Sequence, residues 1–176
     1  MAEKAMDAIA MLKADHRKVE ELFESFEKAR DNARKQKLAT QICTELAVHT
    51  VIEEEIFYPA CKEAADEDLL EESYVEHDGA KVLVAEIAEG SPDDEFFDAK
   101  VTVLSEMIKH HVKEEERAGE GLFAQARAAK LDLAALGAQM ATRKEELLAE
   151  IKVSGLPTLQ TRSFTGHKLK EGRPVA

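Results

Sequence analysis

One residue pattern, present twice, constrains the fold of this chain more than any other feature. A His followed four residues later by a Glu occurs at His49–Glu53 and again at His111–Glu115. On a helix this spacing places both side chains on one face, one turn apart. A lone His precedes each pair, His16 by 33 residues and His77 by 34 residues. Four imidazoles and two carboxylates at matching positions of a repeated helix pair predict a two-metal site inside a four-helix bundle.

The periodicity of the apolar residues predicts an all-α fold. Apolar side chains recur at steps of three and four along residues 3–30, 36–64, 67–89 and 92–118, which is the spacing of one buried helix face. The histidines and glutamates of the repeated pattern lie on these faces. Because short connections make consecutive helices antiparallel, we expect an antiparallel four-helix bundle that brings the polar positions to one level.

Local signals place the ends of these helices. The polar segment Asp31–Arg34 is expected to connect the first two helices, and Asp66 to cap the third. Ser91 and Pro92 are a typical helix start, with Ser as the cap and Pro in the first turn, so we place the beginning of the fourth helix there. Pro59 lacks a backbone donor and should kink or end the second helix nearby.

Two further helical segments follow the bundle. Residues 122–130 are expected to form a short helix, and Asp132 is expected to cap a fifth helix over residues 133–152. The fifth helix has an apolar face but no metal-type residue on it. It should therefore pack against the bundle or against a second subunit, and a homodimer is possible.

The character of the chain changes at its C-terminal end. From residue 154 on, the apolar period ends and the net charge is +3, which leaves −15 on the preceding residues. We therefore divide the chain into a helical domain, residues 1–153, and a flexible basic tail, residues 154–176. Such a basic arm could also lie across the acidic body of its own or a neighbouring subunit.

Composition narrows the classes of partner. The chain has 24 Lys and Arg against 36 Asp and Glu, a formal net charge of −12, which argues against nucleic-acid phosphates or a membrane surface as the main partner. No run has the length of a transmembrane helix, and the N-terminal segment alternates charged and apolar residues, unlike a signal peptide. Cys43 and Cys61 form no C-x-x-C motif. We expect reduced thiols in a cytoplasmic protein.

The helical register separates candidate ligands from their neighbours. His110–Glu114 has the same spacing as His111–Glu115, but only the second pair lies on the apolar face, so we expect the first pair to be solvated. By the same reasoning, Glu54 and Glu55 should face water. A single His on an apolar face is more often a core residue with a hydrogen-bond partner. Four such histidines near the middle of four successive helices, two of them with a Glu one turn away, favour metal binding.

The set of donors indicates the kind of metal. Mixed imidazole and carboxylate ligation suits iron, manganese or zinc. Six protein ligands are too many for one zinc ion, which usually takes four, so we expect two ions that share the glutamates. The ions would be held by His16 with His49 and by His77 with His111, and bridged by Glu53 and Glu115.

The chain resembles the hemerythrin-like, HHE cation-binding family from about residue 5 to residue 150. Four motifs carry the resemblance: Asp15-His16, the run HTVIEEEIFYP that begins at His49, Glu76-His77-Asp78, and HHVKEEE, in which the second His is His111. The resemblance implies a left-handed four-helix bundle that holds two iron ions with an oxo or hydroxo bridge. It further implies reversible binding of dioxygen, or a role in oxygen, nitric oxide, peroxide or iron sensing and storage.

The sequence departs from oxygen-carrying hemerythrins at two of their ligand positions. Those proteins have a second His four residues after the third-helix ligand, where this chain has Lys81, and a fourth-helix carboxylate at the longer H-x-x-x-x-D spacing. One ion should thus lose an imidazole, which argues against simple oxygen carriage. Tyr74, one turn before His77, is expected to line the core, with a role as an extra ligand or hydrogen-bond partner as the alternative.

Three functions stay open from the sequence. The first, favoured by a His-rich ligand set, is a di-iron protein that binds or senses dioxygen or a related small molecule, without being an enzyme. The second is a di-iron oxidase, peroxidase or ferroxidase, which ranks lower because ferritin-like oxidases use more carboxylates and Glu-x-x-His spacings. The third is a structural or interaction protein with a vestigial metal site.

Overall fold

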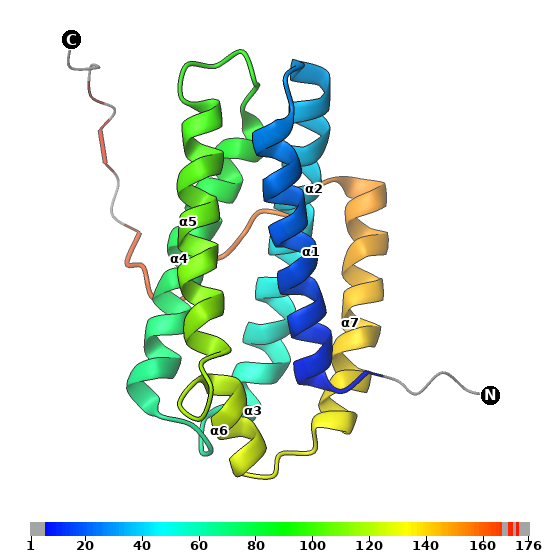
Figure 1. Cartoon of the computed structure of the whole chain (residues 1–176), viewed down its shortest axis with the longest axis vertical. Helices are drawn as coiled ribbons and strands as arrows, with labels where there is room; N and C mark the ends of the chain where they lie inside the picture. The colour runs from blue at the N-terminus through cyan, green and yellow to red at the C-terminus, as the bar shows by residue number, and fades with distance from the viewer. Residues whose placement is uncertain (1–5, 167–168, 171, 173–176) are drawn as a thin grey trace.

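The computed structural model describes residues 6–166, 169, 170 and 172, and it is helical throughout the regular parts of this range (Figure 1). No strand is present among these residues. Residues 1–5 and the tail residues 167, 168, 171 and 173–176 lie outside the described residues. The elements are α1 (Ala8–Lys28), α2 (Asn32–Ile52), the π-helical turn η1 (Glu53–Phe57), α3 (Tyr58–Cys61), α4 (Glu67–Glu89), α5 (Phe97–Glu115), α6 (Leu122–Ala128) and α7 (Leu133–Ser154).

Four of these helices form the bundle, so the predicted all-α fold is confirmed. The helix α1 packs against α2 and α5, and α4 packs against α2 and α5, which leaves a shared interior among the four. The helix α7 lies outside this interior and packs on α1 and α2 of the same chain (Figure 1). Its Gly137 lets α7 approach closely, because a Cβ there would lie 2.5 Å from the backbone oxygen of Met6.

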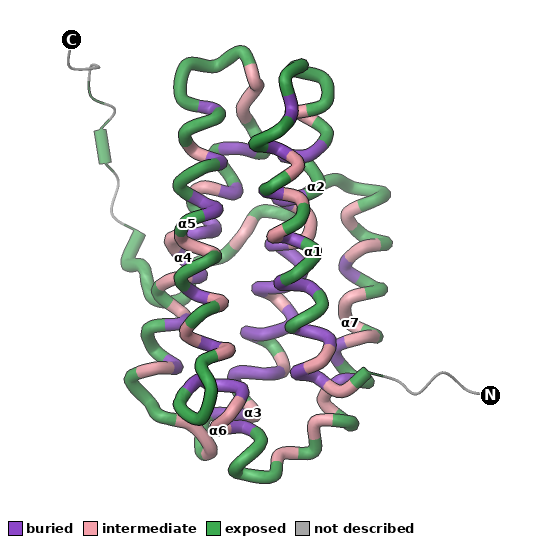
Figure 2. The backbone as a smooth tube through the Cα atoms, in the orientation of Figure 1, coloured by how far each residue is buried: buried purple, intermediate pink, exposed green. Residues whose placement is uncertain are grey.

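The interior consists of two apolar clusters, which together contain side chains from every bundle helix. One contains Ile9, Leu12 and Ile52 and extends to α6 and α7. The other contains Phe23 and Phe97 and extends along α2, α4 and α5. Figure 2 shows the buried positions on the inward sides of the bundle helices. Buried polar residues are also present, among them the four histidines and two glutamates of the repeated pattern.

The predicted caps Asp66 and Asp132 are confirmed, whereas two predicted boundaries are wrong. The side chains of both residues accept hydrogen bonds from the backbone N–H three residues later. Asp31 does the same for Arg34, so α2 begins at Asn32 and the connection predicted at Asp31–Arg34 is largely helix. The helix α5 begins at Phe97 rather than at Pro92, because Ser91–Phe96 form turns in which Asp94 accepts a bond from the Ser91 N–H.

The irregularity predicted near Pro59 takes the form of a π-helical turn. At η1 the N–H of Tyr58 donates to the carbonyl of Glu53, five residues back, instead of four. Each π-helical turn contains an extra residue and rotates the following side chains relative to the preceding helix. The turn therefore changes which residues of this segment face the interior.

The part of the chain that follows α7 is extended. Residues 156–166 contain no helix or strand and run from the end of α7 past α2 to α4 (Figure 1). Leu156 and Leu159 pack against the second apolar cluster. Among the described residues, no helix is long and apolar enough to cross a membrane.

Candidate metal centre

The four histidines of the repeated pattern meet in two pairs inside the bundle. The Nε2 atom of His16 on α1 lies 3.2 Å from Nε2 of His49 on α2. The Nε2 atom of His77 on α4 lies 3.2 Å from Nε2 of His111 on α5. All four side chains are buried. The pairs are those expected from the sequence, each made by one lone His and one His of a His-x-x-x-Glu motif.

The two glutamates each link one histidine pair to the other. Oε2 of Glu53 lies 3.1 Å from Nε2 of His49 and 3.3 Å from Nε2 of His77. On the other side, Oε2 of Glu115 lies 3.4 Å from Nε2 of His16 and 3.5 Å from Nε2 of His111. The six side chains therefore form a closed ring in which carboxylates and histidine pairs alternate. We call these six residues the ligand ring.

Each ring histidine directs its other nitrogen toward a carboxylate outside the ring. For His16, His77 and His111 the contact is a hydrogen bond, which fixes the orientation of the imidazole and directs Nε2 inward, as in many metal sites. The Nδ1 atoms lie 2.8 Å from Glu116 for His16, 3.0 Å from Glu54 for His77, 2.7 Å from Glu76 for His111 and 3.6 Å from Asp15 for His49. Asp15 also accepts a bond from Lys144, so α7 supports the ring although it contributes no ring residue.

The charges of the ring shift the pKa values of its members in opposite directions. Burial opposes protonation of His49, but the carboxylates of Glu53 and Asp15 outweigh it and raise the pKa of His49 to about 10. Burial likewise opposes ionisation of Glu53, but His49 and His77 outweigh it and lower the pKa of Glu53 well below its usual value. The pKa values of His16 and His77 are also raised, again by carboxylates against burial. Without a cation, the carboxylates therefore favour protonation of these three histidines.

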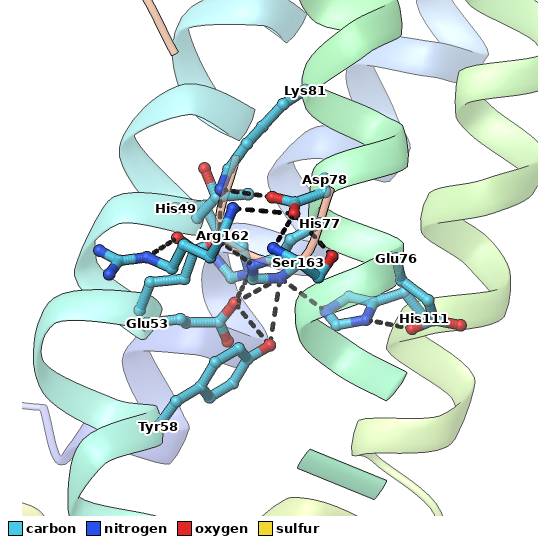
Figure 3. A network of polar contacts seen from close by, with 12 residues as sticks. His49, Glu53, Tyr58, Glu76, His77, Asp78, Lys81, His111, Arg162 and Ser163 are labelled. Carbon is cyan, nitrogen blue, oxygen red and sulfur yellow. Dashed lines mark hydrogen bonds and ion pairs between the residues drawn. The ribbon is translucent and has the colours of Figure 1, made fainter. Parts of the chain in front are cut away.

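Tyr58 is a residue of the site that the sequence analysis missed. Its hydroxyl lies 3.1 Å from Nε2 of His77 (Figure 3). The same hydroxyl donates to Oε1 of Glu115 at 2.9 Å. Burial and the charges of Glu115 and Glu53 raise the pKa of Tyr58 well above its usual value. Tyr74, the aromatic residue singled out from the sequence, packs against the phenol group of Tyr58, and the centroids of the two aromatic groups are 5.2 Å apart. No sequence signal marked Tyr58, because its inward direction follows from the π-helical turn.

The expectation that Glu54 faces water is wrong. Glu54 is only 5% exposed, and its Oε1 atom accepts bonds from His77 Nδ1 and, at 2.6 Å, from Lys81 Nζ. The physical reason is tertiary: Glu54 lies beside Glu53 on the side of α4, where Lys81 and Arg162 contact its carboxylate. Lys81, which stands where oxygen-carrying hemerythrins have a second His, thus contacts Glu54 instead of a ring residue.

His110 and Glu114 lie outside the ring, as the register predicted. His110 is exposed and its Nε2 atom lies 3.3 Å from Oε1 of Glu76 and 3.9 Å from Oε1 of Glu114. The neighbouring His111 is 3% exposed and faces the interior. Two adjacent histidines of one helix therefore occupy opposite environments.

A small apolar cavity lies against the ring histidines and leads toward the surface. It has about 10 Å³ of space for the centre of a water-sized sphere, and its wall includes Val19, Leu46, Ile108 and Val112. That space holds about one water-sized molecule. A larger groove of about 250 Å³ between α1 and α5 shares His16, Ile108 and Val112 with the cavity. The cavity and the groove therefore adjoin at these three residues.

The donors of the ring fit a pair of cations. Its members are four imidazole nitrogens and two carboxylates, the ligands that iron and similar ions prefer. Oε1 of Glu53 and Oε2 of Glu115 are buried and make no hydrogen bond within the described residues. Buried carboxylate oxygens of this kind are costly unless a partner compensates them. Glu53 groups with His16, His49 and Glu115 on one side, and with His77 and His111 on the other, as two sets that could each hold an ion.

A family model matches most of the chain, and a solved structure shares its fold. The model of the "Hemerythrin HHE cation binding domain" family matches residues 7–125 of the chain. A solved structure of a hemerythrin HHE cation-binding domain-containing protein from Mycobacterium kansasii superposes with a TM-score of 0.68 at 22% identity, covering 85% of this chain and 94% of that one. At that identity the likeness shows the fold.

A curated relative shares part of its sequence with this chain. It is a protein of Nostoc sp. named "DNA nickase", 32% identical over 106 residues. The match covers 60% of this chain but only 30% of that protein. The chain therefore spans less than a third of the relative's length.

Proposed function

This chain belongs to the hemerythrin HHE cation-binding family, and from that premise we propose that it binds two iron ions per chain and uses them to bind or sense a small molecule. The ligands would be dioxygen, nitric oxide or peroxide. One observation carries the proposal: the ring is closed, and each of its histidines has a carboxylate near Nδ1. A core histidine needs one partner, whereas these four direct their second nitrogen to one common centre.

The proposal assigns each ring residue a role. One ion would be held by His16 with His49 and the other by His77 with His111, while Glu53 and Glu115 would bridge them. The iron pair would supply reversible one-electron chemistry and open positions for an exogenous ligand. Tyr58, within 3.4 Å of Glu53, His77 and Glu115, lies on the side of the second pair and makes the two ion positions unequal.

The cavity against the ring supports a small ligand. Its wall beyond the histidines is mostly apolar, and its volume of about 10 Å³ suits a molecule of two or three atoms. An apolar pocket excludes water and favours an uncharged ligand over an ionic one. The outer groove is lined by both signs of charge, because Glu20 and Glu116 pair with Arg17 there, so it does not select an anionic ligand.

A di-iron peroxidase or oxidase is the second candidate, and Tyr58 favours it. The buried hydroxyl of Tyr58 donates a hydrogen bond to Glu115 inside the ligand ring. A proton donor next to a redox-active pair is useful for reduction of peroxide or dioxygen. The two functions differ in turnover: a binding protein returns the ligand unchanged, whereas an enzyme consumes it.

Metal analysis together with the absorption spectrum tests the proposal first. Protein purified aerobically from iron-rich medium should contain about two iron ions per chain and show near-ultraviolet charge-transfer bands. Reduction followed by exposure to oxygen should restore the spectrum. Rapid consumption of peroxide by the same sample would favour the enzyme. Iron-free protein with an intact helical fold would contradict both functions and support a structural role.

Adjacent histidines of α5 provide a matched pair of variants. His111→Ala should lose metal binding by at least about tenfold in affinity, because it removes a ring donor that a neighbouring side chain cannot replace. His110→Ala should lose much less affinity, because His110 is exposed and reaches the ring only through Glu76, the carboxylate near Nδ1 of His111. Iron content after desalting measures both. Equal loss in the two variants would contradict the assigned register.

Tyr58 gives a spectroscopic prediction. We expect Tyr58→Phe to keep both iron ions, since the six ring residues remain, but to lose any visible phenolate-to-iron band and to change the reduction potential of the pair. Resonance Raman spectra and a redox titration measure these two properties. A variant with unchanged spectrum and potential would show that the hydroxyl serves only to hold Glu115.

A further inference from the structure

The extended segment after α7 is anchored by one buried carboxylate. Asp78 is fully buried next to His77 in the sequence, and its Oδ2 atom accepts four bonds from the segment Arg162–Phe164 (Figure 3). The donors are the backbone N–H groups of Arg162 at 2.9 Å, Ser163 at 2.6 Å and Phe164 at 3.2 Å, and the Ser163 hydroxyl at 2.7 Å. A carboxylate surrounded by backbone donors in this way fixes the path of the segment.

The same segment reaches the residue that orients a ring histidine. Nε of Arg162 donates to Oε2 of Glu54 at 2.6 Å, and the other oxygen of Glu54 accepts from His77 Nδ1 at 3.0 Å. Lys81 closes the group: its Nζ atom donates to Glu54 at 2.6 Å, to Asp78 at 3.2 Å and to the carbonyl of Gln160 at 2.9 Å. Only Glu54 thus separates Arg162 from His77.

The segment contributes a positive charge to a buried group of carboxylates. Glu54 and Asp78 are two buried carboxylates, and within α4 and η1 the cation that contacts both is Lys81. Arg162 supplies the second positive charge from outside the ring, so Lys81 and Arg162 together match the charges of the two carboxylates when the segment is docked. A buried carboxylate without a compensating charge is costly and tends to reorient or take up a proton. Release of the segment would therefore disturb the carboxylate that holds His77.

We propose that residues 160–164 form a strap that positions the ring ligand His77 through Arg162 and Glu54, so that docking of the strap and binding of the metal stabilise each other. The inference rests on the proposed function of the ring. Arg162 is a positioning residue, because Glu54 stands between it and His77. If docking strengthens metal binding by some factor, metal binding must strengthen docking by the same factor.

Iron retention in full-length variants tests the strap. The probe is ferrous protein mixed with a chromogenic iron chelator, and the readout is the rate of iron loss. Arg162→Ala should lose iron about tenfold faster than the unaltered protein, which is the lower end for outer residues that orient metal ligands. Arg162→Lys, which keeps the charge, should recover part of the loss. Arg30→Ala, at an exposed arginine between α1 and α2, should match the unaltered protein.

Proteolysis of the unaltered protein provides a second measurement that needs no variant. Trypsin cleaves after Arg162, and we expect this cleavage to be slower in iron-loaded than in iron-free protein, followed by mass spectrometry. Unchanged iron loss in Arg162→Ala, or equal cleavage rates with and without iron, would overturn the strap while leaving the proposed function intact. Failure of the unaltered protein to bind iron would instead refute the proposed function, and the strap with it.

Discussion

Replacing Glu53 by alanine should abolish binding of both metal ions, the largest effect we expect from any single substitution. Glu53 is fully buried, and one of its oxygens lies within 3.3 Å of a histidine from each pair. Its loss removes one of the two negative charges that would offset the charge of the cations. The remaining ligands would be four neutral imidazoles and the carboxylate of Glu115. Loss of one anionic ligand shared by both ions should weaken each by about 100-fold or more. Metal content and the near-ultraviolet spectrum measure the result.

The controls separate ligation from folding. Glu53→Gln keeps the volume of the side chain and should also lose the metal, because an amide is a poor bridging ligand. Glu55→Ala, two residues further along η1, should keep it, since Glu55 is exposed and pairs with Arg143 of α7. Circular dichroism should show a helical fold for all three variants. Retention of two iron ions by Glu53→Gln would contradict a bridging carboxylate, and retention of one would mean that the residue serves a single ion.

The bundle and the members of the ring could be predicted because they follow from periodicity. A His and a Glu four residues apart share a helix face whatever the rest of the fold does. Four helices of similar length with short connections can hardly avoid bringing such faces together. The same logic separated His111 from His110 and assigned the caps Asp66 and Asp132. Each of these inferences depends on regular α-helical geometry or on the preference of Asp for the N-cap position.

The residues that were missed depend on departures from that geometry. The π-helical turn η1 rotates the chain, so Tyr58 faces the ring, which an α-helical register does not predict. Glu54 is buried because Lys81 of α4 and Arg162 of the segment after α7 contact it. Nothing in a single sequence distinguishes a π-helical turn from an ordinary one near Pro59. The position of the strap was equally hidden, because Arg162 and Glu54 are brought together over a large separation in the sequence. Contacts of that kind follow from the tertiary fold.

Removing the metal should destabilise the protein, and the difference should grow as the pH rises. In the metal-free protein the pKa of His49 is raised to about 10 from its ordinary value of 6.5. Protonated His49 therefore stabilises the fold fully below pH 6.5, and this contribution is lost as the pH rises through about 10. The lowered pKa of Glu53 acts in the opposite sense, with a contribution that is present above its ordinary 4.5 and lost only in acid. Between neutral and alkaline pH, the metal-free ring thus loses stabilisation.

The metal-bound protein should respond to pH in the opposite direction, because cations need unprotonated imidazoles and compete with protons for them. At about a thousand times its dissociation constant, a metal adds about 4 kcal/mol to stability, which corresponds to a melting temperature about 10 °C higher for a chain of this size. We call the difference in melting temperature between metal-bound and metal-free protein the gap. We expect a smaller gap near about pH 6 and a larger gap near about pH 9. Calorimetry of loaded and chelator-treated protein at both pH values measures the gap, with His110→Ala as the control for an exposed histidine. A gap that narrows toward alkaline pH would show that the ring histidines do not give up protons to the metal, and it would remove them from the ligand set.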